Sequence, residues 1–423
     1  MSSKANFPAP AAGDEVLVVG AGVIGLSAAL RLLRDGRSVR VIDRSGPGAG
    51  ASHGNCGTIT PSHAPPLAAP GVIRKALGWT FRPDAPLYIP LRWDPDLWRW
   101  LWKFAGRSNQ RDWWQAARAK ADLLNASRQR LQHWIEREAV ACGFESSGLL
   151  YAYRDAAAFD AHCAAHAPLA QLGIRFEVLD AATMHRREPL LRDAVAGGIH
   201  FPDDACLRPD RLVAELVRLI EADQGTIRGS AEVVRIDRRG KRVQLADGQW
   251  LGAGKIVLAT GAWSPRFAAD LGVPIPLQPG KGYSLTFERP ASAPAMPMVL
   301  RERAVCVTTW ADGFRLGSTM EFSGYNDSPN PVRLDALARG AQEYLDLPVD
   351  RARGEAWHGW RPMTWDDLPL IGPLPDAPDI VLATGHGMLG VSMSAATADL
   401  VVDRLCGRDA EFDAAPYRVE RFA

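Results

Sequence analysis

The 423-residue chain is 47% hydrophobic and 23% charged, a composition typical of a globular protein that is too long for one ordinary core, so we expect two domains. A formal net charge of +1 and the absence of basic runs give no electrostatic reason to expect a nucleic-acid partner. The six cysteines show neither a CxxC pair nor metal-ligand spacing, which favours reduced thiols over a disulfide framework or a metal site.

Two features of the chain bear on its location in the cell. Residues 1–14 lack the apolar core of a signal peptide, so we expect them to form a loose leader. No apolar run reaches the roughly 18 residues that a membrane span needs. We therefore expect a cytoplasmic protein that is soluble or at most peripheral at the inner face of the membrane.

A buried strand, a glycine turn, a helix and a second strand follow one another over residues 16–44. In this order Gly20 permits a tight turn, Gly22 lets a pyrophosphate approach the backbone, and Gly25 lets the helix pack closely on the strand. The helix N-terminus then offers N–H groups and the positive end of its dipole to the phosphates. Asp43 ends the second strand 18 residues after Gly25, near the spacing at which a carboxylate binds a ribose diol. The pattern predicts a dinucleotide site.

The next part of the chain begins with a glycine-dense loop. Residues 45–57 are too rich in glycine for regular structure, and such loops let the backbone pass close to a flat or charged group. Helices are predicted over 111–141 and 156–171, on either side of a short strand at 149–153. Seven tryptophans crowd residues 79–114. We interpret them as a packed cap over the active site, or else as an exposed stripe that seats the protein on a membrane near quinone.

The chain then returns to the character of a nucleotide-binding domain. A helix is predicted over 207–222, and two short strands over 231–245. A buried strand at 255–258 leads abruptly into Thr260 and Gly261, where the backbone can again meet a cofactor.

The last third of the chain is predicted to hold strands, a glycine turn and one helix. Residues 281–319 are rich in strand patterns, with a hairpin turn at 311–313. A glycine turn at 385–390 precedes a helix at 392–405, so its N–H donors and dipole would point toward a bound cofactor. Segments typical of a nucleotide-binding domain alternate along the chain with segments of a different character. This alternation predicts a discontinuous nucleotide domain with a second lobe built from two insertions.

Taken together, these motifs resemble the FAD-dependent D-amino acid oxidase superfamily, and within it the bacterial D-amino acid dehydrogenase branch. The stretches that carry the resemblance are residues 18–30 with Asp43, residues 52–61, Ala259-Thr260-Gly261, residues 357–372 and residues 384–390. It covers nearly the whole chain and is weakest over 95–195. Within that branch, residues 54–63 look most like enzymes for D-hydroxyproline and D-proline.

The resemblance implies an α/β fold with a discontinuous Rossmann-like FAD-binding domain and an α+β substrate domain that carries an antiparallel sheet. The FAD-binding domain would comprise residues 1–75, 196–270 and 355–423. The substrate domain, which forms the cap, would comprise residues 76–195 and 271–354.

The resemblance also implies residues for a non-covalently bound FAD. The first fingerprint would hold the ADP half, the loop with Asn55 would lie beside the isoalloxazine ring, and Val233 would flank the adenine. The full predicted set is Gly20, Gly22, Val23, Ile24, Gly25, Asp43, Arg44, Ser52, Asn55, Gly57, Val233, Thr260, Gly261, Gly387, Met388, Leu389 and Gly390.

Arg361 lies in a Gly-x-Arg-Pro-x-Thr motif, where the resemblance implies an arginine that binds the substrate carboxylate. A guanidinium suits that role because it binds a carboxylate bidentately and stays charged. The alternative is a structural ion pair with Asp366 or Asp367. Three further residues are weaker candidates for a catalytic role, each with a structural alternative: Tyr283, His53 and His386.

The expected activity is oxidation of the Cα–N bond of a D-amino acid or cyclic D-imino acid, with electrons passed to a quinone or another acceptor that is not oxygen. Three alternatives stay open: an amine oxidase of the glycine or sarcosine type, a nicotinamide-linked dehydrogenase, and a non-catalytic flavin subunit of a larger complex. Asp43 argues against NADP despite the neighbouring Arg44, because a carboxylate would repel the 2′-phosphate.

Overall fold

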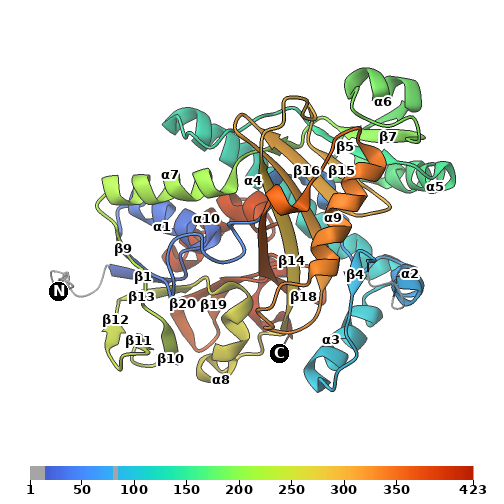
Figure 1. Ribbon diagram of the computed structural model, residues 1–423. Helices are drawn as coiled ribbons and strands as arrows, with labels where there is room; N and C mark the ends of the chain where they lie inside the picture. The colour runs from blue at the N-terminus through green and yellow to red at the C-terminus, as the bar shows by residue number, and fades with distance from the viewer. Residues whose placement is uncertain (1–14, 80–83, 423) are drawn as a thin grey trace.

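The computed structural model describes residues 15–79 and 84–422, so the predicted leader at 1–14 lies outside the described residues. Two large sheets form the framework (Figure 1). The first has six strands, all parallel except the edge strand β19. In spatial order they are β19 (Leu370–Leu374), β20 (Ala377–Thr384), β13 (Lys255–Leu258), β1 (Glu15–Val19), β2 (Ser38–Ile42) and β9 (Thr226–Arg228).

The central strands β1, β13 and β20 of the six-stranded sheet are largely apolar and buried, as is typical of a sheet covered on both faces. In β1, Val16 and Val18 belong to the core formed with helices α1 (Val23–Arg34), α7 (Pro209–Ala222) and α10 (Gly390–Cys406). Leu17 and Val19 point the opposite way, into a core shared with the antiparallel strands β10 (Val233–Asp237), β11 (Arg242–Leu245) and β12 (Trp250–Gly252) and with helix α8 (Ala268–Leu271). The alternation follows the two-residue period of a strand.

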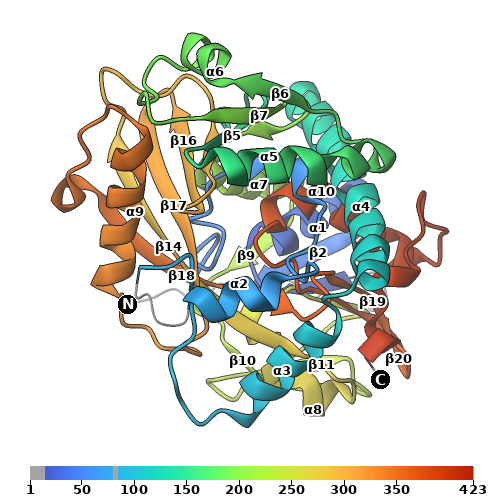
Figure 2. The ribbon, with the colours of Figure 1, turned by 90° about the vertical axis from the view of Figure 1, so that its right-hand side faces the viewer.

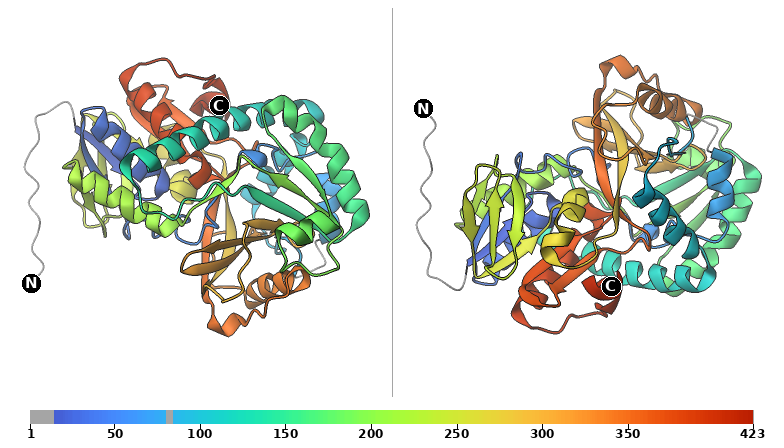
Figure 3. Two further views of the ribbon diagram at one scale, coloured as in Figure 1. Left: turned by 90° about the horizontal axis from the view of Figure 1, so that it is seen from above. Right: turned by 90° about the horizontal axis from the view of Figure 1, so that it is seen from below.

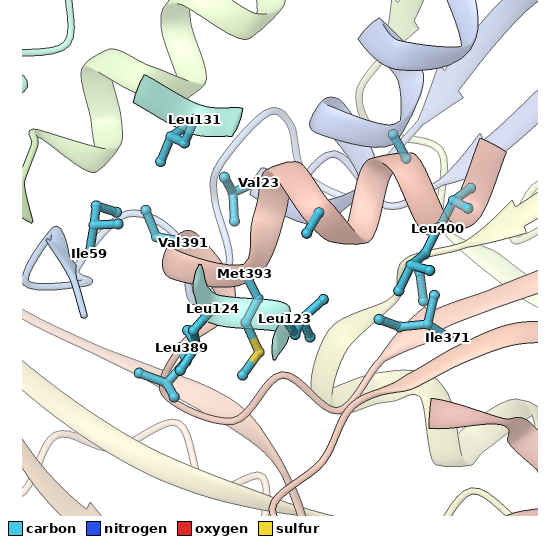
Figure 4. Close-up of a cluster of buried hydrophobic side chains, with 14 of the residues drawn as sticks. Val23, Ile59, Leu123, Leu124, Leu131, Ile371, Leu389, Val391, Met393 and Leu400 are labelled. Atoms are coloured by element: carbon cyan, nitrogen blue, oxygen red, sulfur yellow. The ribbon is translucent and has the colours of Figure 1, made fainter. Parts of the chain in front are cut away.

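Helix α10 is central to the larger core. It packs against α1 on one side and against the long helix α4 (Gln110–Glu138) on another. Figure 4 shows Met393 of α10 close to Leu123 and Leu124 of α4, and Leu400 of α10 near Ile371 of β19. The two views of Figure 3 show how this C-terminal helix returns to the N-terminal part of the chain. The packing fixes the start of α10, which lines the site described below.

The second sheet has nine strands. In spatial order they are β18 (Glu355–Thr364), β14 (Leu277–Glu288), β17 (Gly313–Glu321), β16 (Val305–Trp310), β15 (Met298–Leu300), β5 (Leu149–Tyr153), β7 (Gly197–Phe201) and β6 (Glu177–Asp180), with β4 (Leu87–Tyr88) paired to β17. Helix α9 (Pro331–Tyr344) covers one face through Leu334, Leu337 and Tyr344. Figure 2 shows this sheet and α9 beside the remaining helices α2 (Val72–Trp79), α3 (Pro95–Gly106), α5 (Ala156–His166) and α6 (Ala181–Arg187). A short pair joins β3 (Thr58–Ile59) to β8 (Ala205–Cys206).

Most predicted elements are found close to their expected bounds. The strand expected at 149–153 is β5, and the turn expected at 311–313 joins β16 to β17. All six strands of the first sheet fall within the segments assigned to the FAD-binding domain. Strands β7 and β18 also come from segments assigned to the FAD-binding domain, but they pair within the nine-stranded sheet. The domain boundaries themselves stay a prediction.

Candidate active site

One large cavity, with a volume of about 1120 Å³, is lined by residues of both large sheets, by the loop at 45–69 and by helices α2 and α3. Sites for small molecules commonly have volumes of about 300–1,000 Å³. The cavity is therefore large enough for an extended cofactor together with a small substrate.

The turn from β1 to α1 forms one part of the wall. Gly20 has a φ of +108°, and a Cβ on it would lie 2.4 Å from the Ala259 carbonyl oxygen. A Cβ on Gly25 would lie 1.9 Å from the Gly20 carbonyl oxygen, so the helix starts directly against the strand. The Ser52 hydroxyl accepts a hydrogen bond of 3.0 Å from the Val23 N–H. Gly20, Val23 and Ser52 line the cavity, and Gly25 supports the turn from behind.

Asp43 lies at the end of β2 and ties this turn together. Its Oδ2 accepts a 2.8 Å hydrogen bond from the Ala21 N–H, and its Oδ1 accepts one of 2.8 Å from Ser45. Asp43 also lines the cavity, so its carboxylate can accept from a ribose hydroxyl while it holds the turn. The neighbouring Arg44 guanidinium stacks 3.6 Å above the Trp263 ring.

The glycine loop meets the start of α10. The Asn55 side chain accepts from the Gly57 N–H at 2.8 Å and donates to the Met388 carbonyl oxygen at 3.4 Å. Asn55 lines the cavity, whereas Gly57 does not, because a Cβ on Gly57 would lie 1.9 Å from the Leu207 carbonyl oxygen. Gly57 thus supports the loop from outside the cavity wall, and its role as a cofactor contact stays a prediction.

The glycine turn that leads into α10 faces the cavity through Gly387, Met388 and Leu389, and the first residue of the helix, Gly390, also lines it. The Gly387 N–H donates to the Pro362 carbonyl oxygen at 3.1 Å, which joins this turn to β18. First-turn N–H groups of a helix have no intrahelical acceptor, and the dipole adds positive potential there. The remaining predicted residues Gly22, Ile24, Val233, Thr260 and Gly261 line the same cavity.

Arg361 of β18 also lines the cavity. Its Nη1 donates to the Thr319 carbonyl oxygen, and its Nη2 lies 3.5 Å from the Ser318 carbonyl oxygen. The guanidinium lies over Gly282 of β14, since a Cβ there would be 2.4 Å from the Arg361 Cζ. Burial lowers the pKa of Arg361, and the Cys56 and Cys306 sulfur atoms act in the opposite direction.

The alternative ion pairs of Arg361 are not formed. Asp366 pairs with Arg421 at 2.8 Å, and Asp367 pairs with Lys120 at 2.6 Å. Arg361 is thus held by carbonyl oxygens and keeps its charge available for an anion in the cavity.

Tyr283 does not reach the cavity. Its side chain is 1% exposed, lies in the core under α9 and donates a 3.0 Å hydrogen bond to Glu321 Oε2. Neighbouring residues of a strand point to opposite faces, so Gly282 faces Arg361 and Tyr283 faces away. The prediction of a catalytic Tyr283 is therefore wrong.

The two predicted histidines have different environments. His53 is half-exposed, lies outside the cavity wall and places its Nε2 3.4 Å from the Glu355 carboxylate, so it has no access to a substrate there. His386 lines the cavity, and its Nε2 lies 3.1 Å from the Thr397 hydroxyl. Burial lowers the pKa of His386 to about 3, which keeps the ring neutral.

Further residues that the sequence analysis did not select as site residues also line the cavity. Tyr151 of β5, Arg301 after β15 and Cys306 of β16 line the cavity together with His63. Tyr151 and Arg301 belong to no motif. The signal for His63 was its place just after the glycine loop.

The mouth of the cavity carries exposed apolar side chains. Leu67, Ile73, Leu91 and Trp98 are exposed and also line it. Trp93 and Trp102 are 92% and 71% exposed, whereas Trp100 is buried and donates to the Met363 carbonyl oxygen at 3.1 Å. The burial of Trp100 fits the interpretation of a packed cap, whereas the seating of the exposed tryptophans on a membrane stays a prediction.

The described residues include neither a metal-binding cluster nor a helix that could span a membrane. Within 15–79 and 84–422, no group of three or more His, Cys, Asp or Glu side chains is placed to hold a metal ion. None of the helices in that same part of the chain has the length and apolar character needed to cross a membrane.

Comparisons with known proteins agree with this geometry. The family model described as "FAD dependent oxidoreductase" (DAO) matches residues 15–404. The chain is 35% identical to a D-amino acid dehydrogenase of Paramagnetospirillum magneticum, over 96% of this chain and 99% of that protein. It is 32% identical to a D-amino acid dehydrogenase of Sinorhizobium medicae, over 96% and 100%.

Solved structures show the same fold. Glycine oxidase from Geobacillus kaustophilus superposes with a TM-score of 0.75 at 22% identity, over 96% of this chain and 98% of that chain. L-proline dehydrogenase from P. horikoshii superposes with a TM-score of 0.72 at 18% identity, over 97% and 98%.

Proposed function

Because the chain belongs to the DAO family of FAD-dependent oxidoreductases, we propose that it is a D-amino acid dehydrogenase whose favoured substrate is a cyclic D-imino acid, cis-4-hydroxy-D-proline or D-proline. The observation that carries the proposal is Arg361, a guanidinium that lines the cavity and is bound by carbonyl oxygens instead of a carboxylate. The names of the relatives support the stereochemistry. The loop around residues 54–63 supports the cyclic substrate.

The wall of the cavity fits FAD. Gly20 has no Cβ, so a pyrophosphate can approach the backbone there. The N–H groups at the start of α1 suit the same anion, and Ser52 lies beside them. Asp43 would accept from the ribose, Val233 would flank the adenine, and residues 387–390 would lie along the flavin. FAD is held without a covalent bond in this proposal. When bound, it supplies the two-electron acceptor for the oxidation.

The residues of the chain position the substrate for that oxidation. The two Nη groups of Arg361 bind the carboxylate, and bidentate pairing fixes the plane of the substrate. The nitrogen must be neutral, because its lone pair forms the C=N bond as the Cα–H bond breaks. The ammonium group therefore gives up a proton before the reaction. The product is an imine, which hydrolyses in water or, from a proline ring, remains cyclic.

The electron acceptor in this proposal is a quinone in a membrane surface. Support comes from the exposed apolar mouth, where Leu91, Trp93, Trp98 and Trp102 project from α3 and the segment before it. Tryptophan and basic side chains together are typical of helices that lie in the interface of a bilayer, and α3 also carries Lys103. Peripheral docking there would bring the cavity mouth to the lipid.

The test is an anaerobic absorbance titration of the purified protein with D-proline, cis-4-hydroxy-D-proline, D-alanine and their L-forms, and with glycine and sarcosine. Bleaching of a yellow protein by the D-forms, fastest with a cyclic one, is the expected result. Bleaching only by glycine or sarcosine would replace the proposal with an amine oxidase. A yellow protein that no amine bleaches would indicate a subunit of a larger complex. Rapid peroxide formation in air would refute the quinone as acceptor.

A further inference from the structure

A chain of hydrogen bonds leads from the cavity wall to a buried carboxylate. The Tyr151 hydroxyl lies 3.3 Å from His63 Nε2, and His63 Nδ1 lies 3.3 Å from the Ser62 hydroxyl. Ser62 Oγ donates to Asp204 Oδ2 at 2.5 Å, and the Ser62 N–H donates to Asp204 Oδ1 at 3.1 Å. The Tyr151 hydroxyl also interacts with Ser62 directly. The four residues therefore form one connected network.

The network runs from the cavity into the protein. Tyr151, His63 and Ser62 line the cavity, whereas Asp204 lies behind them. Asp204 is 1% exposed and Ser62 is 3% exposed. Asp204 comes just before β8, whose pairing with β3 holds it against the residues that follow β3. The neighbouring Asp203 is partly exposed and pairs with Arg175.

The three hydrogen bonds that link the side chains of Tyr151, His63, Ser62 and Asp204 can all be oriented toward Asp204. Tyr151 donates its O–H to His63 Nε2, His63 donates its Nδ1–H to Ser62 Oγ, and Ser62 donates its O–H to Asp204. The Tyr151 oxygen is then an acceptor at the start of the chain, and the Asp204 carboxylate is the acceptor at its end. Such a chain conducts a proton from the cavity to Asp204.

The charged groups around the network suit this direction. Burial raises the pKa of Asp204 to about 7, a shift that Asp203 increases and that the hydrogen bonds of Ser62 and the Arg128 guanidinium of α4 oppose. The carboxylate can therefore gain a proton near neutral pH. Burial, Arg301 and Lys120 lower the pKa of His63 to about 3. Its ring is thus neutral, with one donor and one acceptor nitrogen, as a relay requires.

The reaction needs such an acceptor. A substrate ammonium must lose a proton, and the cavity wall also carries the cations Arg361 and Arg301. We propose that Asp204 accepts the proton of the bound substrate ammonium through Tyr151, His63 and Ser62. The ammonium N–H bond breaks as the Tyr151 oxygen gains that proton, each member passes on its own proton, and Asp204 becomes a neutral acid. This inference rests on the proposed function, because it assigns the proton acceptor of that reaction.

The test measures the protonation of Asp204 directly. The probe is the α-methyl analogue of the best substrate (2-methyl-D-proline for D-proline), which binds but has no Cα–H bond to break. Infrared difference spectra at about pH 8, above the folded-state value for Asp204, record whether binding creates a protonated carboxyl group. The variants are Asp204→Asn, which cannot accept a proton, Asp204→Glu, which can, and Tyr151→Phe, which breaks the chain at its other end. The matched control is Asp203→Asn.

The expected result is a new band of a protonated carboxyl group in the wild type, Asp203→Asn and Asp204→Glu, and none in Asp204→Asn or Tyr151→Phe. With the substrate itself, Asp204→Asn should lower kcat/KM by about 10²-fold, the lower range for a lost general base, and should flatten the fall of kcat/KM at acidic pH. Tyr151→Phe leaves the hydrogen bonds between Ser62 and Asp204 intact, so it tests the relay independently of any effect of Asp204→Asn on stability.

Several results would overturn the inference. One is an unchanged infrared band and pH profile in both Asp204→Asn and Tyr151→Phe. Another is the same band with cyclopentanecarboxylate, which binds Arg361 but has no nitrogen. Reduction of the wild-type flavin by a D-amino acid in either case would leave the proposed function standing. A wild type that no D-amino acid reduces would instead refute the proposed function and the relay together.

Discussion

Replacing Arg361 tests the assignment of the substrate carboxylate site. Arg361→Met removes the guanidinium while the carboxylate of a bound substrate keeps its charge in a buried cavity. Breaking a buried ion pair by removal of one partner costs about 3–5 kcal/mol, which corresponds to a loss of about 10²–10⁴-fold in kcat/KM. Arg361→Lys keeps the charge but loses one of the two donors. A hydrogen bond to a charged group contributes about 1.5–3 kcal/mol, so we expect a loss of about 10–150-fold.

Rapid-mixing absorbance under anaerobic conditions separates the effect of each substitution on substrate affinity from its effect on the rate of flavin reduction. The dissociation constant of the substrate comes from the dependence of the rate on concentration, and the rate of flavin bleaching comes from its limit. The control is Arg301→Met, which removes the same charge from the same cavity. An equal loss of affinity in both variants would refute the reasoning, because it would show an effect of the overall field instead of pairing at Arg361. Unchanged affinity in Arg361→Met would refute it as well.

Three further predictions follow from single contacts. Gly282→Ala places a Cβ 2.4 Å from the Arg361 Cζ, so it should displace the guanidinium and weaken substrate binding about tenfold in the same titration. Asp204 has a pKa raised from 3.8 to about 7, so its protonated form stabilises the folded protein below about pH 4, and this contribution is lost as the pH rises through 7. The shift of about three units corresponds to about 4 kcal/mol, so Asp204→Asn should gain up to that much stability relative to the wild type between about pH 4 and pH 8 in chemical unfolding. Replacing Trp93 and Trp102 by serine should reduce sedimentation with anionic vesicles at least several-fold and leave bleaching by substrate unchanged.

Each of these predictions has a matched control. Gly46→Ala introduces a Cβ that meets no atom within 4 Å, and it should leave substrate binding unchanged. Asp203→Asn at the surface should not reproduce the pH dependence of Asp204→Asn. Replacing Trp250, which is exposed on β12 away from the cavity, should leave vesicle binding unchanged. Equal loss of vesicle binding from Trp250→Ser would contradict the assignment of the docking surface.

The cofactor end of the cavity could be predicted from the sequence because its contacts are local. Gly20, Gly22 and Gly25 act through one strand, one turn and one helix, and Asp43 follows on the adjacent parallel strand. The spacing of these residues is therefore fixed by the dimensions of a β-α-β unit. The start of α10 was recognisable for the same reason, since a glycine turn and the helix that follows it are contiguous in the chain.

The substrate end could be predicted only in part, because it is assembled from strands that are distant in sequence. Arg361 was found through its motif, but the residue that receives its guanidinium is Gly282, one position before the predicted Tyr283. Which of two neighbouring residues faces the cavity depends on the register between β14 and β18 and on where α9 packs. A shift of one residue exchanges the two faces of a strand, and the sequence of β14 alone does not determine its register.

The residues of the proposed relay could be predicted from the sequence even less, because they too lie far apart along the chain. Ser62 and His63 follow the glycine loop, Tyr151 lies on β5 and Asp204 precedes β8, and only the pairing of β3 with β8 brings the carboxylate to Ser62. Burial of Asp204 costs free energy that the hydrogen bonds of Ser62 and the charge of Arg128 offset only in part, since its pKa stays raised. Buried groups with strongly shifted pKa values often have a functional role. The proposed reaction would supply that role, because it must remove a proton from a substrate that Arg361 would bind through its carboxylate. Arg361 would thus bind the carboxylate of the substrate, and Asp204 would accept the proton of its ammonium group.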